Sequence, residues 1–494
     1  MNIHIRKGFL FAIAAALFIC SMLIRFIALS RTEFANGWDG YFYLVQLQSL
    51  FQRGSMHSPD FSTIYPIMIV IQWMSGNYEL TYKICSAILA GAFTVSMFGV
   101  AFRWSRAFWP SLFIGAYTLF SPELTWFAAQ YPKNLLGIIF FLLLLGTLKN
   151  RKPAPTLILL LLNFFGHRIT FVLSGITVLL QFLGRRVKMK FLLITSAALL
   201  LIVVAGYLMP GLLNFTDLSR FSNEFSGMPQ FAPVSFVNLF GSELVSGCWK
   251  FEIILLSVLF VVSAGIQIWF VVQKRANLVL SVFLIVLAVL IFPFFRFTAE
   301  GFGFRLFHTF VLLTPLPIVL FEKAINKAFI AVPLMVVAII GGLFASSSYQ
   351  PELHDPPYAM YAQVGKTLEK SKHFADAELL IGHKALAEYL TFSTGKDVMP
   401  WIPEYAVARE GLWRIATDIR MQELRFYLDV TDLQFVEMLS MRYTLIREDI
   451  WQKLLQQIVT KDNDEDLLEE LNTWKNPNNI RPKYLSKDRK ATQG

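Results

Sequence analysis

The chain has 494 residues, of which 55% are hydrophobic and only 16% are charged, and its formal net charge at pH 7 is +10. Soluble domains carry roughly 25% charged residues, so this composition excludes an ordinary soluble enzyme and predicts an integral membrane protein. Nucleic acid is not expected as a partner, because the basic residues are distributed over short segments between apolar runs, as membrane topology requires.

Apolar runs of about 20 residues recur from Phe9 to about Ala345 and are long enough to cross a bilayer as helices. The first run follows Arg6 and Lys7 and lacks a small-residue cleavage pattern, so it is expected to be retained as a helix. From Ser347 onward such runs stop, and acidic residues slightly outnumber basic ones. The excess of positive charge therefore belongs to the apolar part.

Six basic clusters separate the apolar runs, and the positive-inside bias places all of them on the cytoplasmic side. They lie at Arg6/Lys7, Arg103/Arg106, Lys149/Arg151/Lys152, Arg185–Lys190, Lys274/Arg275 and Lys323/Lys327. Each intervening stretch must then cross an even number of times, which gives about eleven helices. The prediction is a mainly α, multi-pass bundle in the plasma (inner) membrane, with a cytoplasmic N-terminus and an extracytoplasmic C-terminal domain.

The same constraint makes the apolar segment 154–183 a hairpin, because basic clusters flank it on both sides. Its turn is expected at Gly166-His167-Arg168, and each arm of roughly 15 residues would be only about 20 Å long. His167 and Arg168 would then lie below the outer membrane surface. Within the first outer loop, 31–82, apolar residues 64–74 are too few to span and predict an interfacial helix.

The domain organisation follows from these patterns. We expect a transmembrane domain over 1–346 with a large outer loop over 211–250, a small soluble α/β domain over 347–475 and a polar terminus over 476–494. In the soluble domain the patterns predict strands over 378–383, 397–401 and 442–447 and helices over 384–392 and 450–459.

Cations on the outer side are exceptions to the positive-inside bias. Five of them fall in predicted outer turns: Lys133, His167, Arg168, Arg296 and Arg305. Several cations at membrane depth suit an anionic group at the bilayer boundary, such as a lipid phosphate or pyrophosphate. Each one alone could instead be a snorkelling anchor. Their convergence favours a phosphate-binding site.

An acidic and aromatic patch, Asn36-Gly-Trp-Asp-Gly-Tyr-Phe-Tyr43, follows the first helix. Asp39 either caps the helix predicted from Tyr41 onward or supplies a reactive carboxylate. The rings of Trp38, Tyr41 and Tyr43 favour the membrane interface and can also pack on sugar faces.

These features together resemble the GT-C glycosyltransferases, over nearly the whole chain. The resemblance lies in Trp38-Asp-Gly-Tyr-Phe-Tyr with a helix over 44–52 that ends at Gly54, in Ile64-Tyr-Pro-Ile-Met-Ile-Val, in Gly303-Phe-Arg-Leu-Phe-His-Thr before Pro315 and Pro317, and in the tail with Glu388-Tyr-Leu-Thr-Phe-Ser-Thr-Gly. The Trp-Trp-Asp-Tyr-Gly signature of the oligosaccharyltransferase branch does not occur. Transfer of a whole oligosaccharide to asparagine is therefore disfavoured.

The resemblance implies an inverting transfer of a hexose or pentose from a polyprenyl-phosphate-linked donor to a glycan, lipid or protein acceptor. Asp39 would be the general base, and the five outer cations would bind the donor phosphate. Trp38, Tyr41, Tyr43 and Tyr65 would contact substrate. Glu123 is expected to be a solvated loop acid. The alternative is a ligand of a divalent cation, Mg or Mn, although family members with a clear metal site often have an acidic pair there.

Two other hypotheses compete with this one. A transporter or flippase for a lipid-linked glycan would also require cations at membrane depth, but it should spread polar residues through the midplane. A polymerase or ligase of surface polysaccharide would act through the outer loop 211–250. The charges of that loop, Asp217, Arg220, Glu224 and Glu243, are instead expected to be simply solvated.

Overall fold

The protein is described by a computed structural model. It describes residues 7–58, 60, 62–148, 153–183, 247–296, 302–320, 339–340, 355–370, 379–382, 384–396, 398–400, 412–417, 435–438 and 443–447. The chain divides into two compact units, Met1–Gly40 with Ser49–Asp355, and Tyr41–Gln48 with Pro356–Gly494. The predicted outer loop up to residue 246, the helix 450–459 and the terminus 476–494 lie outside the described residues.

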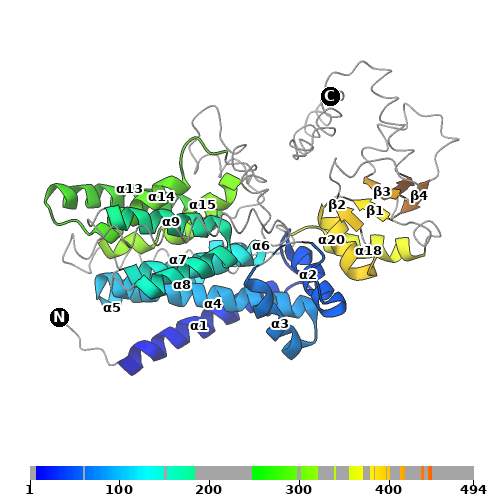
Figure 1. Ribbon diagram of the computed structural model, residues 1–494, viewed down its shortest axis with the longest axis horizontal. Helices are drawn as coiled ribbons and strands as arrows, with labels where there is room; N and C mark the ends of the chain where they lie inside the picture. Colours follow the sequence, from blue (N-terminus) through cyan, green and yellow to red (C-terminus); the bar gives the residue numbers. More distant parts are fainter. Residues whose placement is uncertain are drawn as a thin grey trace, which may run out of the picture. The chain divides into compact units, whose positions relative to one another are not determined.

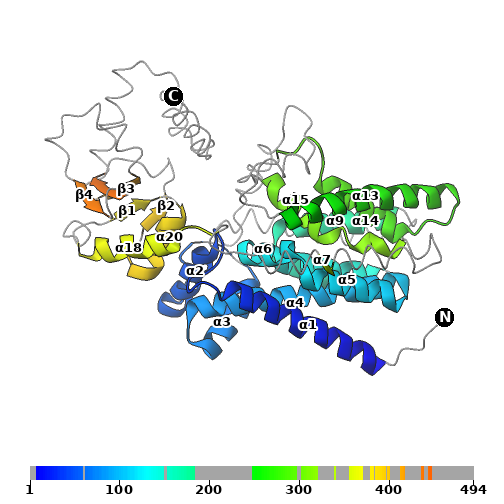
Figure 2. The same cartoon turned by 180° about the vertical axis from the view of Figure 1, so that it is seen from behind.

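Helices make up the described part of the chain as far as residue 320. In chain order they are α1 Lys7–Leu29, α2 Gly40–Arg53, α3 Ile64–Ser75, α4 Tyr78–Ser105, α5 Phe108–Phe120, α6 Pro122–Gln130, α7 Pro132–Leu148, α8 Pro153–Gly166, α9 Arg168–Leu183, α13 Gly247–Val272, α14 Leu278–Leu290, α15 Phe302–Leu313 and the short 3-10 helix η1 Leu316–Ile318. Helix α4 packs against α1, α5 and α7, and α7 also packs against α8 and α9 (Figures 1 and 2).

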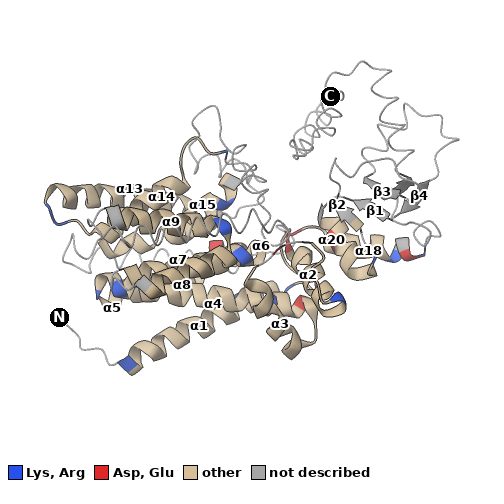
Figure 3. Ribbon diagram, in the orientation of Figure 1, with Lys and Arg blue, Asp and Glu red and all other residues tan. Residues whose placement is uncertain are grey.

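Several of these helices are long and apolar enough to cross a bilayer. Within the described ranges they are α1, α4 and Glu252–Val272 of α13, and a fourth span arises if α6 and α7 are taken as one broken helix. Most Lys and Arg residues lie near helix ends, with long uncharged stretches between them (Figure 3). The chain is therefore a membrane protein, whereas the count of about eleven crossings and the sidedness stay predictions.

The predicted hairpin is present. Helices α8 and α9 pack against each other and are interrupted only at His167. The turn therefore lies where the distribution of basic clusters placed it. Helix α13 begins at Gly247, so the end of the expected outer loop, near Lys250, is already helical.

Helices α2 and α3 also agree with the helices that the sequence predicted in these two segments. Helix α2 ends at Gly54, which adopts the left-handed conformation with φ 68°. Helix α3 has apolar residues on two faces. Ile64 and Met68 are buried, whereas Trp73 and Met74 are 76% and 84% exposed, as expected of a helix lying in a membrane interface.

A sharp elbow joins α6 to α7. The two helices meet at Tyr131 with a bend of 118°. Pro122 and Pro132 begin the two helices, a position where the missing proline N–H costs no helical hydrogen bond. All nine residues of α6 are buried. The sequence predicted only an outer turn at Lys133, not this elbow.

The second unit contains a mixed sheet. Its described elements after residue 355 are α18 Tyr358–Glu369, β1 Leu379–Gly382, α20 Lys384–Thr394, β2 Val398–Pro400, β3 Leu412–Thr417, β4 Phe435–Met438 and β5 Tyr443–Arg447. The strand order is β2-β1-β3-β5-β4, with β1 parallel to β2 and β3, and β5 antiparallel to β3 and β4. The sequence predicted β1, α20, β2 and β5, but missed β3 and β4. The division between the units falls at Asp355. The boundary predicted at 346 lies outside the described residues and stays a prediction.

Gly137 allows α7 and the start of α9 to approach closely. A Cβ built there would collide with Thr170 Oγ1 and would lie 2.7 Å from His167 Cβ. Small residues allow such contacts between membrane helices. We expect Gly137→Ala to lower the free energy of unfolding by about 1–3 kcal/mol, as measured by thermal unfolding in detergent.

Gly175 provides the matched control on α9, because no atom would lie within 4 Å of a Cβ added there. Gly175→Ala should change the free energy of unfolding by less than about 1 kcal/mol. Equal effects of the two substitutions would contradict the close packing at Gly137.

Candidate functional site

Asp39 lies at the N-cap position of α2, but its side chain makes no capping hydrogen bond. Its Oδ2 atom instead lies 3.8 Å from Nη2 of Arg305 on α15, and both side chains are partly exposed. Asp39 and Arg305 are far apart in the sequence, since they lie near the beginning and near the end of the predicted transmembrane domain. The structure therefore brings together the predicted base and one of the predicted phosphate-binding cations.

Arg305 also contacts the elbow between α6 and α7. Its guanidinium carbon lies 4.7 Å from the ring centroid of Tyr131. A guanidinium over an aromatic face is stabilised by the negative potential of the ring. Tyr131 therefore helps to direct Arg305 toward Asp39.

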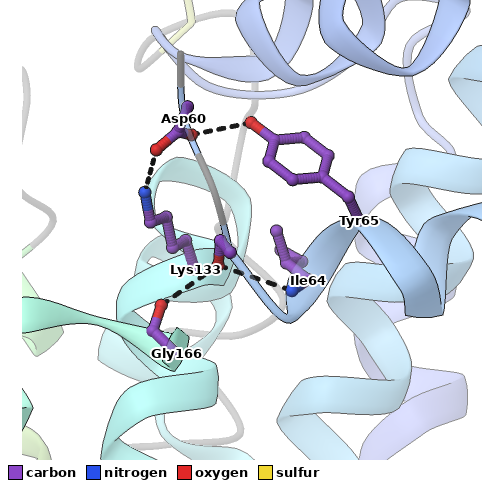
Figure 4. A network of polar contacts seen from close by, with 6 residues as sticks. Asp60, Ile64, Tyr65, Lys133 and Gly166 are labelled. Carbon is purple, nitrogen blue, oxygen red and sulfur yellow. Dashed lines mark hydrogen bonds and ion pairs between the residues drawn. The ribbon is translucent and has the colours of Figure 1, made fainter. Parts of the chain in front are cut away.

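Lys133 is the second residue of α7 and forms an ion pair with Asp60 (Figure 4). Asp60 also accepts a hydrogen bond of 2.7 Å from the hydroxyl of Tyr65. Nearby, the hydroxyl of Ser62 donates to the carbonyl of Gly166 at 3.1 Å, which ties this loop to the end of α8. A carboxylate thus neutralises the charge of Lys133 in this structure.

His167 lies among the predicted cations. Burial lowers its pKa well below the usual 6.5, and the positive charges of Lys133, Arg305 and Arg168 lower the pKa further. The imidazole is therefore neutral at pH 7. Its Nδ1 atom is inaccessible to solvent and has no hydrogen-bond partner among the described residues. The environment of His167 is thus positively charged and suited to an anion.

The remaining predicted cations are less central. Arg168 is partly exposed at the first position of α9, and its charge acts on His167. Arg296 is exposed beyond the end of α14.

Glu123 corrects an expectation. The sequence favoured a solvated loop acid, whereas Glu123 lies in α6 and is 0% exposed. Its Oε1 atom lies 2.5 Å from Nδ1 of His308 on α15, which is also fully buried. The ring of His308 packs against Trp126 at a centroid distance of 4.1 Å. The pair therefore joins α6 to α15 inside the protein.

His308 was not predicted as a site residue, although a signal was present. Arg305 and His308 are three residues apart and lie on neighbouring turns of one helix face. This spacing could have indicated that one helix presents a cation toward Asp39 and an imidazole toward α6.

The aromatic residues occupy different environments. Tyr41 and Tyr43 are only 1% and 4% exposed, and Tyr41 packs against Tyr358 and Tyr389 in the second unit. Tyr65 is buried beside Asp60. Trp38 is 55% exposed. Among these four rings, Trp38 therefore offers the accessible face expected for contact with sugar.

The residues present do not fit the possible metal site at Glu123. No three His, Cys, Asp or Glu side chains in the described part of the chain are grouped so that they could hold a metal ion. The Glu123 carboxyl group is engaged by His308. The role of Glu123 in this structure is therefore to join two helices.

Solved structures share this fold. The crystal structure of ArnT from Cupriavidus metallidurans in the apo state matches with a TM-score of 0.54 and 13% identity, over 88% of this chain and 97% of that chain. ArnT from the same organism bound to undecaprenyl phosphate matches with a TM-score of 0.54 and 12% identity, over 88% and 98%. At this level of identity the likeness shows that the chain shares the fold of these two structures. No protein-family model matches the sequence, and no curated protein matches it either.

We expect His308→Phe to destabilise the protein, because the substitution removes a hydrogen-bonding partner of the buried Glu123 carboxyl group. The expected loss is about 1–3 kcal/mol, measured by thermal unfolding in detergent. The double variant Glu123→Leu/His308→Phe should lose less than the sum of the single variants, because it removes both polar groups. Strict additivity would contradict direct coupling of the pair.

Proposed function

We propose that this chain is a membrane glycosyltransferase. It transfers a sugar from a polyprenyl-phosphate-linked donor to a glycan, lipid or protein acceptor on the extracytoplasmic face. The observation that carries the proposal is the 3.8 Å contact of Asp39 with Arg305, near Lys133 and His167. A fold shared with ArnT, of which one solved structure is bound to undecaprenyl phosphate, supports this class of donor.

The reaction needs a base and a group that stabilises the leaving charge. The acceptor hydroxyl or amide gives its proton to the Asp39 carboxylate as its oxygen or nitrogen bonds to the anomeric carbon. The bond from that carbon to the phosphate oxygen breaks, and its electron pair remains on the phosphate. Attack opposite the leaving group inverts the anomeric configuration. Arg305 stabilises the negative charge that develops on the phosphate.

Lys133, His167 and Arg168 extend the positive environment for the phosphate. Arg296 is also proposed to bind the phosphate, in a less central position. In the structure, Asp60 and Asp39 act as counter-ions of Lys133 and Arg305. A bound phosphate would compete with these carboxylates for the same cations. Trp38, with its exposed ring, is the proposed contact for a sugar face.

We expect Asp39→Asn to reduce sugar transfer by roughly 10²- to 10⁴-fold, because the amide cannot accept the proton. The variant should still insert, fold and bind the lipid-linked donor. Transfer is measured in detergent or proteoliposomes with a radiolabelled polyprenyl-phosphate sugar. Glu33→Gln is the matched control, since Glu33 is an exposed carboxylate of the same segment. Activity of Asp39→Asn equal to the wild type would refute the role of Asp39.

We expect Arg305→Gln to reduce kcat/KM for the donor by roughly 10²-fold, because the variant lacks the cation that lies 3.8 Å from Asp39. Arg305→Lys should recover part of the loss, since it restores the charge but not the planar contact with Tyr131. Arg275→Gln, at an exposed arginine between α13 and α14, serves as the control. If Arg275→Gln lowered kcat/KM as much as Arg305→Gln does, the effect would not be specific to Arg305.

A flippase would also bind a lipid phosphate with these cations. The two classes differ in the product, because only a transferase makes a new glycosidic bond. Reconstituted vesicles that translocate the lipid-linked sugar without forming a covalent product would favour transport over the proposed transfer.

A further inference from the structure

We propose that Asp355 is a positioning residue that holds the loop carrying Asp39 through direct and Gln130-mediated hydrogen bonds. This inference rests on the proposed function of Asp39. It concerns residues 36–38, the end of α6 and Asp355, all of which belong to the first unit.

Asp355 accepts hydrogen bonds from both members of the dipeptide Asn36-Gly37. Its Oδ2 atom accepts from Asn36 Nδ2 at 3.1 Å, and its Oδ1 atom accepts from the backbone N–H of Gly37 at 2.8 Å. The two oxygens therefore fix both a side chain and the backbone, two residues before Asp39. Such a bidentate arrangement restricts rotation of the loop as well as its displacement.

Gln130 completes the arrangement from the last position of α6. Its Nε2 atom donates to Asp355 Oδ1 at 3.1 Å, while its Oε1 atom accepts from the backbone N–H of Trp38 at 2.9 Å. Gln130 is 1% exposed. The backbone N–H of Gly37 thus donates to Asp355, and the next N–H, that of Trp38, donates to Gln130. The side chains of Asp355 and Gln130 also bond to each other.

Gly37 shows how closely the loop lies on α6. It has φ +82°, and a Cβ at this position would collide with the carbonyl oxygen of Ala129. The same carbonyl accepts a hydrogen bond of 2.6 Å from the hydroxyl of Tyr82. The backbone at residues 129–130 therefore cannot recede without breaking another bond, and the loop rests on a fixed support.

The charge of Asp355 depends on pH near neutrality. Burial raises its pKa to about 7, although the bonds from Gly37, Asn36 and Gln130 and the charge of Lys83 lower the pKa. Because the folded-state pKa is raised, the carboxylate is ionised above about pH 7 and protonated below it. Protonation removes acceptor capacity, so the loop should loosen as the pH falls through 7.

The charge that acts directly on Asp355 comes from α4. Lys83 of α4 interacts with Asp355 and donates to the carbonyl of Thr32 at 2.5 Å. Glu33 and Glu79 act in turn on Lys83. Groups facing Asp355 from the loop and from α6 are the neutral Asn36, Gly37 and Gln130.

The test is Asp355→Asn in the full-length protein. The substitution replaces one acceptor oxygen by a donor that cannot bond to Asn36 Nδ2 or Gly37 N–H. The expected result is a fall in kcat of roughly 10- to 100-fold, with the donor KM changed by less than about 3-fold. In the wild type, kcat should fall as the pH drops through 7 and Asp355 becomes protonated. The plot of kcat against pH for the variant should lack this fall. Glu369→Gln, at an exposed carboxylate of α18, is the control.

Hydrogen exchange separates this inference from the proposed function. The amides of Gly37 and Trp38 should exchange at least about 10-fold faster in Asp355→Asn than in the wild type. Gln130→Ala should have a similar effect, and the double variant should add little. If the variant does not fold, Asn36→Ala, which removes a single bond, is measured in the same way.

Unchanged kcat and unchanged exchange in a folded variant would overturn the positioning role. Faster exchange with unchanged kcat would overturn it as well, because the loop would not need to be held. A wild-type protein without transferase activity would instead contradict the proposed function. In that case, exchange would still report whether Asp355 holds the loop.

Discussion

The bend between α6 and α7 is the constraint on which the site depends. Breaking a membrane helix exposes backbone groups, which must be satisfied within the protein. The elbow uses this break to present several residues in different directions. Gln130 bonds to the Asp39 loop, Tyr131 packs under Arg305, and Lys133 meets Asp60. One interruption thus positions both the carboxylate and the cations.

Charge at the candidate site is balanced within the protein. Arg305 lies beside Asp39 and Lys133 beside Asp60, so each cation has a carboxylate as counter-ion. An isolated charge in such a position would be costly to desolvate. The same pairing keeps the cations oriented, since each side chain has a defined partner. Neutral His167 adds a polar group to this positive region without adding charge of its own.

Sequence patterns predicted features that depend on local or topological rules. The basic clusters predicted the hairpin at His167, and Gly54 predicted the end of α2. Contacts between segments that are distant in the sequence could not be predicted from such patterns. His308 lies 185 residues from Glu123, and Asp355 lies 318 residues from Gly37. Glu123 was therefore expected to be a loop acid. Aromatic composition was equally ambiguous, because it cannot distinguish a ring exposed to substrate from one in a core.

Helix α6 has a further consequence for proteins related to this chain by descent. All nine of its residues are buried, so no position faces water or lipid. Substitution is then limited to side chains of similar volume and polarity, because both cavities and overpacking are destabilising. In homologous chains this segment should therefore be the most conserved. Substitutions in it should covary with substitutions in α15.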